Sequence, residues 1–136
     1  RSEKGFEVVA REDTNGTFDS ALEAAKKILN EQPDITAIMC GNDQMAVAAK
    51  TALNLAGNDQ TVVYSIDGSP DIKKELKKAD GQIAGTVAQS PVNIGKKAVD
   101  IALDILEGKD FEKETSVDVF MINKENVEMY GADGWQ

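Results

Sequence analysis

Apolar and polar residues follow one another along the chain with two different periods. Short apolar runs rich in β-branched residues predict strands, and runs in which apolar residues recur every three or four positions predict amphipathic helices. The predicted strands cover residues 6–10, 35–40, 61–66, 83–87 and 117–122, and the predicted helices cover residues 20–30, 43–56, 70–78 and 91–106.

The order of these elements is βαβαβαβαβ, with short connections. This alternation predicts an α/β fold with a parallel sheet, helices on both faces and right-handed crossovers. Strand 35–40 is expected to be central and buried. Ser20 and Glu23 have the spacing of a capping box at the start of the first helix. Gly57 is expected to end the second helix, and Pro70 to begin the third.

The chain is organised around a strand–turn–helix junction at residues 36–49, which read TAIMCGNDQMAVAA. In α/β proteins ligands bind at such junctions, in the crevice outside the carboxyl ends of the strands. Asn42 and Asp43 are also both good helix caps. The junction alone leaves open whether these residues bind a ligand or only cap the helix.

The other predicted strands end in similar polar turns. The loops at residues 12–18, 41–43, 67–69 and 89–91 should share one edge of a parallel sheet. Amides donate and accept hydrogen bonds, a carboxylate accepts from hydroxyls, and an aromatic ring covers the apolar face of a sugar. This edge therefore suits a neutral polyhydroxylated ligand, although the same residue types are ordinary turn formers.

The predicted helix at residues 91–106 is apolar around most of its circumference. Its polar residues are confined to one stripe, formed by Lys96, Lys97, Asp100 and Asp104. A helix of this kind requires burial on more than one side. It is expected either to lie deep against the sheet or to pack on something outside this chain.

Composition narrows the function further. The 136 residues suit one domain, and the net charge of −9 argues against nucleic acid and anionic membranes as partners. The absence of histidine excludes histidine-based zinc sites and triads. The single cysteine, Cys40, is expected to be a small buried hydrophobe. No nucleophile lies beside a base, so we expect no enzyme activity, metal or cofactor.

No apolar run approaches the roughly 18 residues of a membrane span. No signal peptide is visible, and the chain starts at Arg1 without a methionine. We therefore expect it to be part of a longer protein.

Three motifs in order, GNDQMAVAAKTAL, VVYSIDGSPD and GTVAQSPVNIG, followed by VDVFMINKENV, resemble the sugar-binding proteins of bacterial ABC transporters. The resemblance is to the ribose-binding type, with the type I periplasmic binding fold, and it covers residues 6–127. The family has two α/β lobes that close around a sugar. The resemblance implies that residues 1–136 are the C-terminal lobe, and that residues 90–116 cross toward an N-terminal lobe absent from this chain.

The resemblance also implies which residues bind the sugar. Asn42 and Gln89 match amides that hold sugar hydroxyls, Asp67 matches a carboxylate that accepts from them, and Phe18 matches an aromatic that stacks on the sugar. The loop before Phe18 is slightly longer than in the family. Asp43 is then the expected helix cap.

The implied partners are a sugar or polyol, the permease subunits of a transporter, and either the missing lobe or a second copy of this chain. We expect an exposed apolar patch, or two chains that exchange elements to cover it, and weak sugar binding by this lobe alone. The implied location of the full-length protein, which would carry a signal peptide, is the periplasm or, as a lipoprotein, the cell surface.

Two alternatives remain. The effector-binding domain of a sugar-responsive repressor shares the fold, but there a Thr-Thr-Val-like run and a basic residue usually precede Gln-Pro. A phosphoacceptor receiver domain also alternates β and α, with Glu12, Asp13 and Asp67 as acidic residues, Thr86 ending a strand and Lys124 following the last strand. Its weakness is the short, half-polar first strand.

Overall fold

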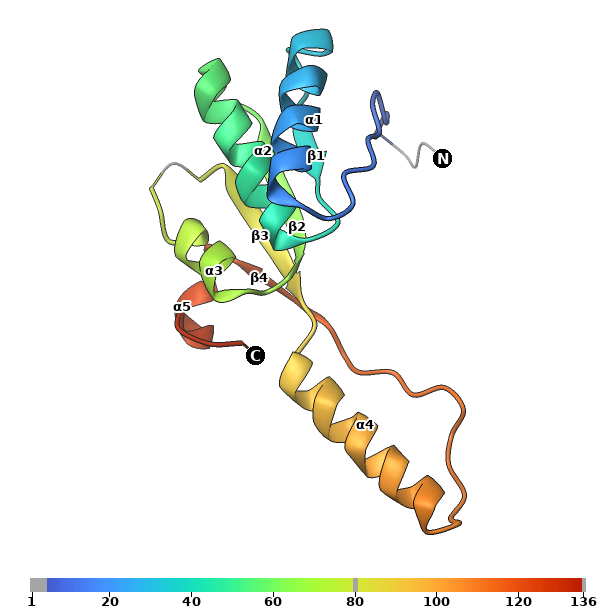
Figure 1. The fold of residues 1–136 in the computed structure, drawn as a ribbon. Helices are drawn as coiled ribbons and strands as arrows, with labels where there is room; N and C mark the ends of the chain where they lie inside the picture. The colour runs from blue at the N-terminus through green and yellow to red at the C-terminus, as the bar shows by residue number, and fades with distance from the viewer. Residues whose placement is uncertain (1–4, 80, 136) are drawn as a thin grey trace.

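The computed structural model describes residues 5–79 and 81–135, so Arg1 lies outside the described residues. The nine elements alternate strictly from the first helix onward (Figure 1). The helices are α1 (Phe18–Glu31), α2 (Asp43–Ala56), α3 (Pro70–Leu76), α4 (Pro91–Leu106) and α5 (Val127–Tyr130), and the strands are β1 (Ala37–Met39), β2 (Val62–Asp67), β3 (Ile83–Ala88) and β4 (Phe120–Asn123).

The strands form one sheet in the order β1-β2-β3-β4. The pairs β1–β2 and β2–β3 are parallel, as predicted, and the α/β class is confirmed. The prediction of a fully parallel sheet is wrong for β4, which runs antiparallel to β3. The reason is the path of the chain, because α4 extends away from the sheet beyond the end of β3 and the following segment returns to that same end (Figure 1).

The predicted strand at residues 6–10 does not form in the described sheet. Residues 5–12 instead line a pocket of about 850 Å³ that also contacts β1. In the described sheet β1 pairs with β2, and residues 5–12 form no strand on its other side. As a result β1 is an edge strand, with Met39 76% exposed, rather than the central buried strand that we predicted.

The helices that cover the sheet lie on one face. Their buried side chains, such as Leu53 of α2 and Ile72 of α3, share one core with Val63 of β2 and Ile122 of β4. Side chains of the opposite face remain exposed, namely Met39, Ile66 and Met121. The prediction of helices on both faces is therefore wrong for the described residues, because α4 leaves the sheet instead of covering it.

No described residue of α4 is buried, which agrees with the expectation of an exposed apolar patch. Its exposed large hydrophobic residues are Val92, Ile94, Val99, Leu103, Ile105 and Leu106. Although apolar, none of the helices in the described ranges has the length and hydropathy needed to cross a membrane.

The helix ends show which local sequence signals predicted a helix boundary correctly. Gly57 ends α2 in the left-handed conformation, with φ 67°, and Pro70 begins α3, both as predicted. The predicted capping box is wrong, because α1 begins at Phe18, with Thr17 as the N-cap residue. Cys40 is buried, and this burial raises the pKa of its thiol to about 11, as expected for an inert hydrophobe.

Candidate ligand site

The carboxyl ends of the parallel strands bring the predicted residues together. Asn42 follows β1, Asp67 ends β2 and Gln89 follows β3. A pocket of about 570 Å³ is lined by Phe18, Asn42 and Asp67, and a second pocket of similar size is lined by Asp67 and Gln89. The two pockets meet at Asp67, so the four predicted residues border one continuous region of the surface.

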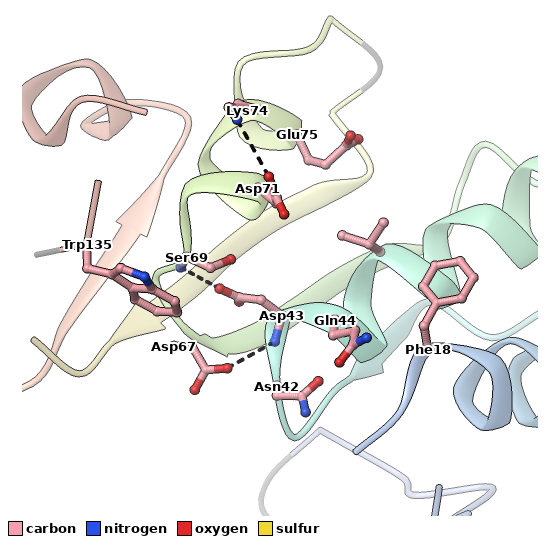
Figure 2. A pocket seen from close by; sticks show the side chains of 11 residues that line it. Phe18, Asn42, Asp43, Gln44, Asp67, Ser69, Asp71, Lys74, Glu75 and Trp135 are labelled. Atoms are coloured by element: carbon pink, nitrogen blue, oxygen red, sulfur yellow. Dashed lines mark hydrogen bonds and ion pairs between the residues drawn. The ribbon is translucent and has the colours of Figure 1, made fainter. Parts of the chain in front are cut away.

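Asp67 is the centre of this region. Gln89 donates from Nε2 to Asp67 Oδ1 over 2.9 Å. The backbone N–H of Asp43 lies 3.5 Å from Asp67 Oδ2 (Figure 2). Each oxygen keeps capacity to accept a further hydrogen bond, because a carboxylate accepts about four. Burial, with a smaller effect from the Asp43 carboxylate, raises the pKa of Asp67, while these two hydrogen bonds oppose the change.

The backbone is strained at three of the four loops around the site. Three non-glycine residues have positive φ, namely Asn15 at 49°, Asp67 at 128° and Ser90 at 50°. Asn15 precedes Phe18, Asp67 is the last residue of β2, and Ser90 follows β3. Such conformations cost roughly 1–3 kcal/mol each and cluster at binding sites. Their position supports a functional interpretation of this edge of the sheet.

The structure assigns the helix cap to Asn42 rather than to Asp43. Asn42 is the N-cap of α2, since its Oδ1 accepts from the Met45 N–H over 2.8 Å, and its Nδ2 donates to the Gly16 carbonyl over 3.0 Å. The assignment of Asp43 as the cap is therefore wrong. Asn42 keeps one amide hydrogen and one lone pair for a ligand, so capping does not prevent a second role.

Asp43 is instead the buried link between the loops. Its Oδ1 accepts from the hydroxyls of Ser65 and Thr86 over 2.5 and 2.7 Å, and its Oδ2 accepts from the Ser69 N–H over 2.6 Å. The hydroxyl of Thr86 in turn accepts from the Gly68 N–H over 3.1 Å. The carboxylate thus connects the starts of α2 and α3 to two neighbouring strands, which fixes the loop that carries Asp67.

Phe18 lines the first pocket from the start of α1, at the side opposite Trp135 (Figure 2). Trp135 comes from the C-terminal tail and lines both pockets, beside Asp67. No sequence signal indicates this placement, because the tail contains no periodic pattern and lies far from the strand ends in the chain. Among the described residues no group of three His, Cys, Asp or Glu could hold a metal ion.

Comparison with known proteins agrees with this geometry. The family model described as periplasmic binding protein domain matches residues 2–110. The ribose import binding protein of Salmonella typhimurium is 34% identical over 120 residues, which cover 88% of this chain and 40% of that protein. The D-allose-binding periplasmic protein of Escherichia coli is 33% identical over 100 residues, which cover 73% of this chain and 32% of that protein.

Solved structures give the same fold. An ABC transporter periplasmic solute binding protein from Actinobacillus succinogenes with bound D-allose superimposes with a TM-score of 0.85 and 29% identity, covering 91% of this chain and 44% of that one. A solute binding protein from Bacillus halodurans with bound myo-inositol superimposes with a TM-score of 0.85 and 29% identity, covering 95% of this chain and 44% of that one. These relatives are binding proteins rather than enzymes, and the chain spans less than half the length of each.

Proposed function

Because the chain belongs to the periplasmic binding protein domain family, we propose that it is the C-terminal lobe of a solute-binding protein that delivers a sugar or polyol to an ABC transporter. The observation that carries the proposal is the meeting of Asn42, Asp67 and Gln89 at the carboxyl ends of successive strands. The relatives named for ribose, D-allose and myo-inositol support the class of ligand.

In this proposal each side chain has a separate task. Asp67 accepts hydrogen bonds from two ligand hydroxyls, Asn42 donates from its remaining amide hydrogen, and Gln89 orients the Asp67 carboxylate while contributing its own carbonyl oxygen. Phe18 covers an apolar C–H face of the ligand. The site is acidic overall, with Asp43 buried beneath it, so a neutral ligand fits better than an anion.

The proposal also accounts for α4. Residues 90–116 cross toward a second lobe, and the exposed apolar face of α4 packs there, or against a second copy of the chain. The lobe alone then binds ligand weakly, because half of the cleft that excludes water is absent. The full-length protein lies outside the cytoplasmic membrane, as the periplasmic names of its relatives suggest, and delivers the ligand to the permease subunits of a transporter.

The receiver-domain alternative has no support in the geometry. Glu12 pairs with Lys27 at 2.6 Å, and Asp13 accepts from the Asn15 N–H at 3.0 Å in its own loop. The carboxylate nearest to Asp67 belongs to Asp43, which is bound by three donors of its own. The repressor alternative shares the fold and stays a prediction that no particular contact favours.

Isothermal titration calorimetry of the natural full-length chain with D-ribose, D-allose and myo-inositol tests the proposal. We expect at least one of these to bind, and Asp67→Asn to weaken binding by about 10- to 100-fold through loss of charge-assisted hydrogen bonds. Asp118→Asn, at an exposed position on the segment that returns from α4, is the matched control. Absence of binding across a panel of sugars and polyols would contradict the proposal.

A further inference from the structure

Trp135 stands beside the candidate site without belonging to any of the strand ends that build it. It is the only tryptophan of the chain. Its side chain lines both pockets that meet at Asp67, and the residue is 49% exposed. Figure 2 shows the indole on one side of Asp67 and Asn42, with Phe18 on the other side. The polar floor of the site therefore has an aromatic ring at each end.

The tail that carries Trp135 contacts α3, and the short helix before the tail packs on β4. Lys73 of α3, which is fully buried, donates from Nζ to the carbonyl oxygen of Gly134, the residue next to Trp135. Before the tail, the rings of Phe120 and Tyr130 stack at a centroid distance of 5.0 Å. The position of Trp135 is thus set by α3, the same helix whose N-terminal loop carries Asp67.

The use of Lys73 for this contact is informative. Burial lowers the pKa of this ammonium group, because the charged form loses its water, and the nearby Asp133 only partly opposes the change. Burying the Lys73 ammonium group costs desolvation free energy, and the group donates to one backbone carbonyl of the tail. The tail is better explained if its position matters to the site.

A purely structural role does not fit the exposure of Trp135. A tryptophan that stabilises a fold buries most of its large apolar surface. Here half of the residue remains exposed, and the half-exposed ring borders a polar pocket that contains carboxylates. Such an arrangement leaves an aromatic face available for a ligand with both hydroxyls and apolar C–H groups.

We propose that Trp135 is a second aromatic wall of the ligand site, which stacks on a neutral sugar or polyol whose hydroxyls bind Asn42 and Asp67. The inference rests on the proposed function and adds a contact from the C-terminal tail to it. Lys73 is then a positioning residue, because it holds the tail without touching the ligand. The ligand lies between Phe18 and Trp135, and the indole N–H supplies one further donor.

The test compares four forms of the natural full-length chain, namely wild type, Trp135→Ala, Trp135→Phe and Leu55→Ala. Leu55 is the control, because it is an exposed large hydrophobic residue, 70% exposed, in the last turn of α2 and lines neither pocket. Calorimetry with D-ribose, D-allose and myo-inositol measures affinity. The difference in emission between wild type and Trp135→Phe isolates the signal of this indole, and iodide quenching of that signal measures its accessibility.

We expect Trp135→Ala to weaken binding by about 10-fold, Trp135→Phe by about 3-fold or less, and Leu55→Ala not at all. Saturating ligand should protect Trp135 from iodide, an effect that a purely structural role would not produce. Unchanged affinity in Trp135→Ala together with unchanged quenching in wild type would overturn the inference while leaving the proposed function intact. If wild type binds none of the ligands, the proposed function fails, and the inference fails with it.

Discussion

Replacing Asp43 tests whether one buried carboxylate holds the loops of the site together. Asp43 is 3% exposed, so water cannot take the place of its side chain. In Asp43→Ala, the hydroxyls of Ser65 and Thr86 and the N–H of Ser69 lose their acceptor. Each unsatisfied buried donor costs about 1–3 kcal/mol, and the two hydroxyls can rotate toward other acceptors. We therefore expect a total loss of roughly 3–5 kcal/mol in the free energy of unfolding.

Asp43→Asn separates the contribution of the charge from that of the contacts. The amide oxygen can still accept from Ser69, and the amide nitrogen can donate to the two hydroxyls, which are able to accept. Charge assistance is lost and the two hydroxyls must turn their own hydrogens to other acceptors, so the expected cost is about 1–2 kcal/mol. Asp118→Ala, at an exposed position, should remain within about 0.5 kcal/mol of wild type.

Urea denaturation followed by circular dichroism measures these differences, provided that the slope of the transition is unchanged. The interpretation predicts a clear order, with alanine most damaging, asparagine intermediate and the surface control neutral. If Asp43→Ala costs less than about 1 kcal/mol, or as little as the asparagine variant, the carboxylate does not connect the loops as described.

Three further predictions follow from the same structure. Burial raises the pKa of Asp67, so the folded protein holds this proton to a higher pH than the unfolded chain, and ionisation of Asp67 costs stability as the pH rises through the folded-state pKa. The free energy of unfolding of Asp67→Asn in urea, relative to wild type, should therefore increase between about pH 3 and pH 7, and a difference that stays constant with pH would contradict this. Gly68→Ala should cost about 2–4 kcal/mol because the new Cβ would lie 2.6 Å from the Ala88 Cβ, whereas Gly108→Ala, at a similar positive φ but with nothing within 4 Å, should cost only about 1 kcal/mol by thermal unfolding. Leu103→Lys on α4 should leave the melting temperature of this 136-residue chain unchanged but reduce its self-association in light scattering at tens of micromolar, and a wild-type chain that is already monomeric would refute the expected covering of α4.

The positions of Asn42, Asp67 and Gln89 could be predicted because parallel strands deliver their carboxyl ends to one edge. The distribution of tasks within the Asn42–Asp43 pair could not. Both residue types are good caps, and the choice depends on the donors of Ser65 and Thr86, which arrive from strands far along the chain. Local sequence contains no information about such a contact.

The errors in the fold have the same origin. The apolar run at residues 6–10 has the composition of a strand, but it forms no pair in the described sheet, because pairing depends on the placement of a neighbouring strand and not on composition alone. The direction of β4 depended on whether α4 packs over the sheet or extends beyond it. The apolar circumference of α4 indicated that it needs partners, yet it could not show on which side they lie.

The points where the chain leaves and rejoins the sheet are adjacent, since Ala88 at the end of β3 pairs with Phe120 at the start of β4. The 16 residues of α4 form a lever about 24 Å long that begins at this point. A rotation of about 10° there would carry its far end through roughly 4 Å. Gln89 lies at this hinge, between β3 and α4, and donates a hydrogen bond to Asp67. A second lobe packed on α4 would therefore move when the Gln89–Asp67 contact changes, and a movement of that lobe would change the geometry of the ligand site.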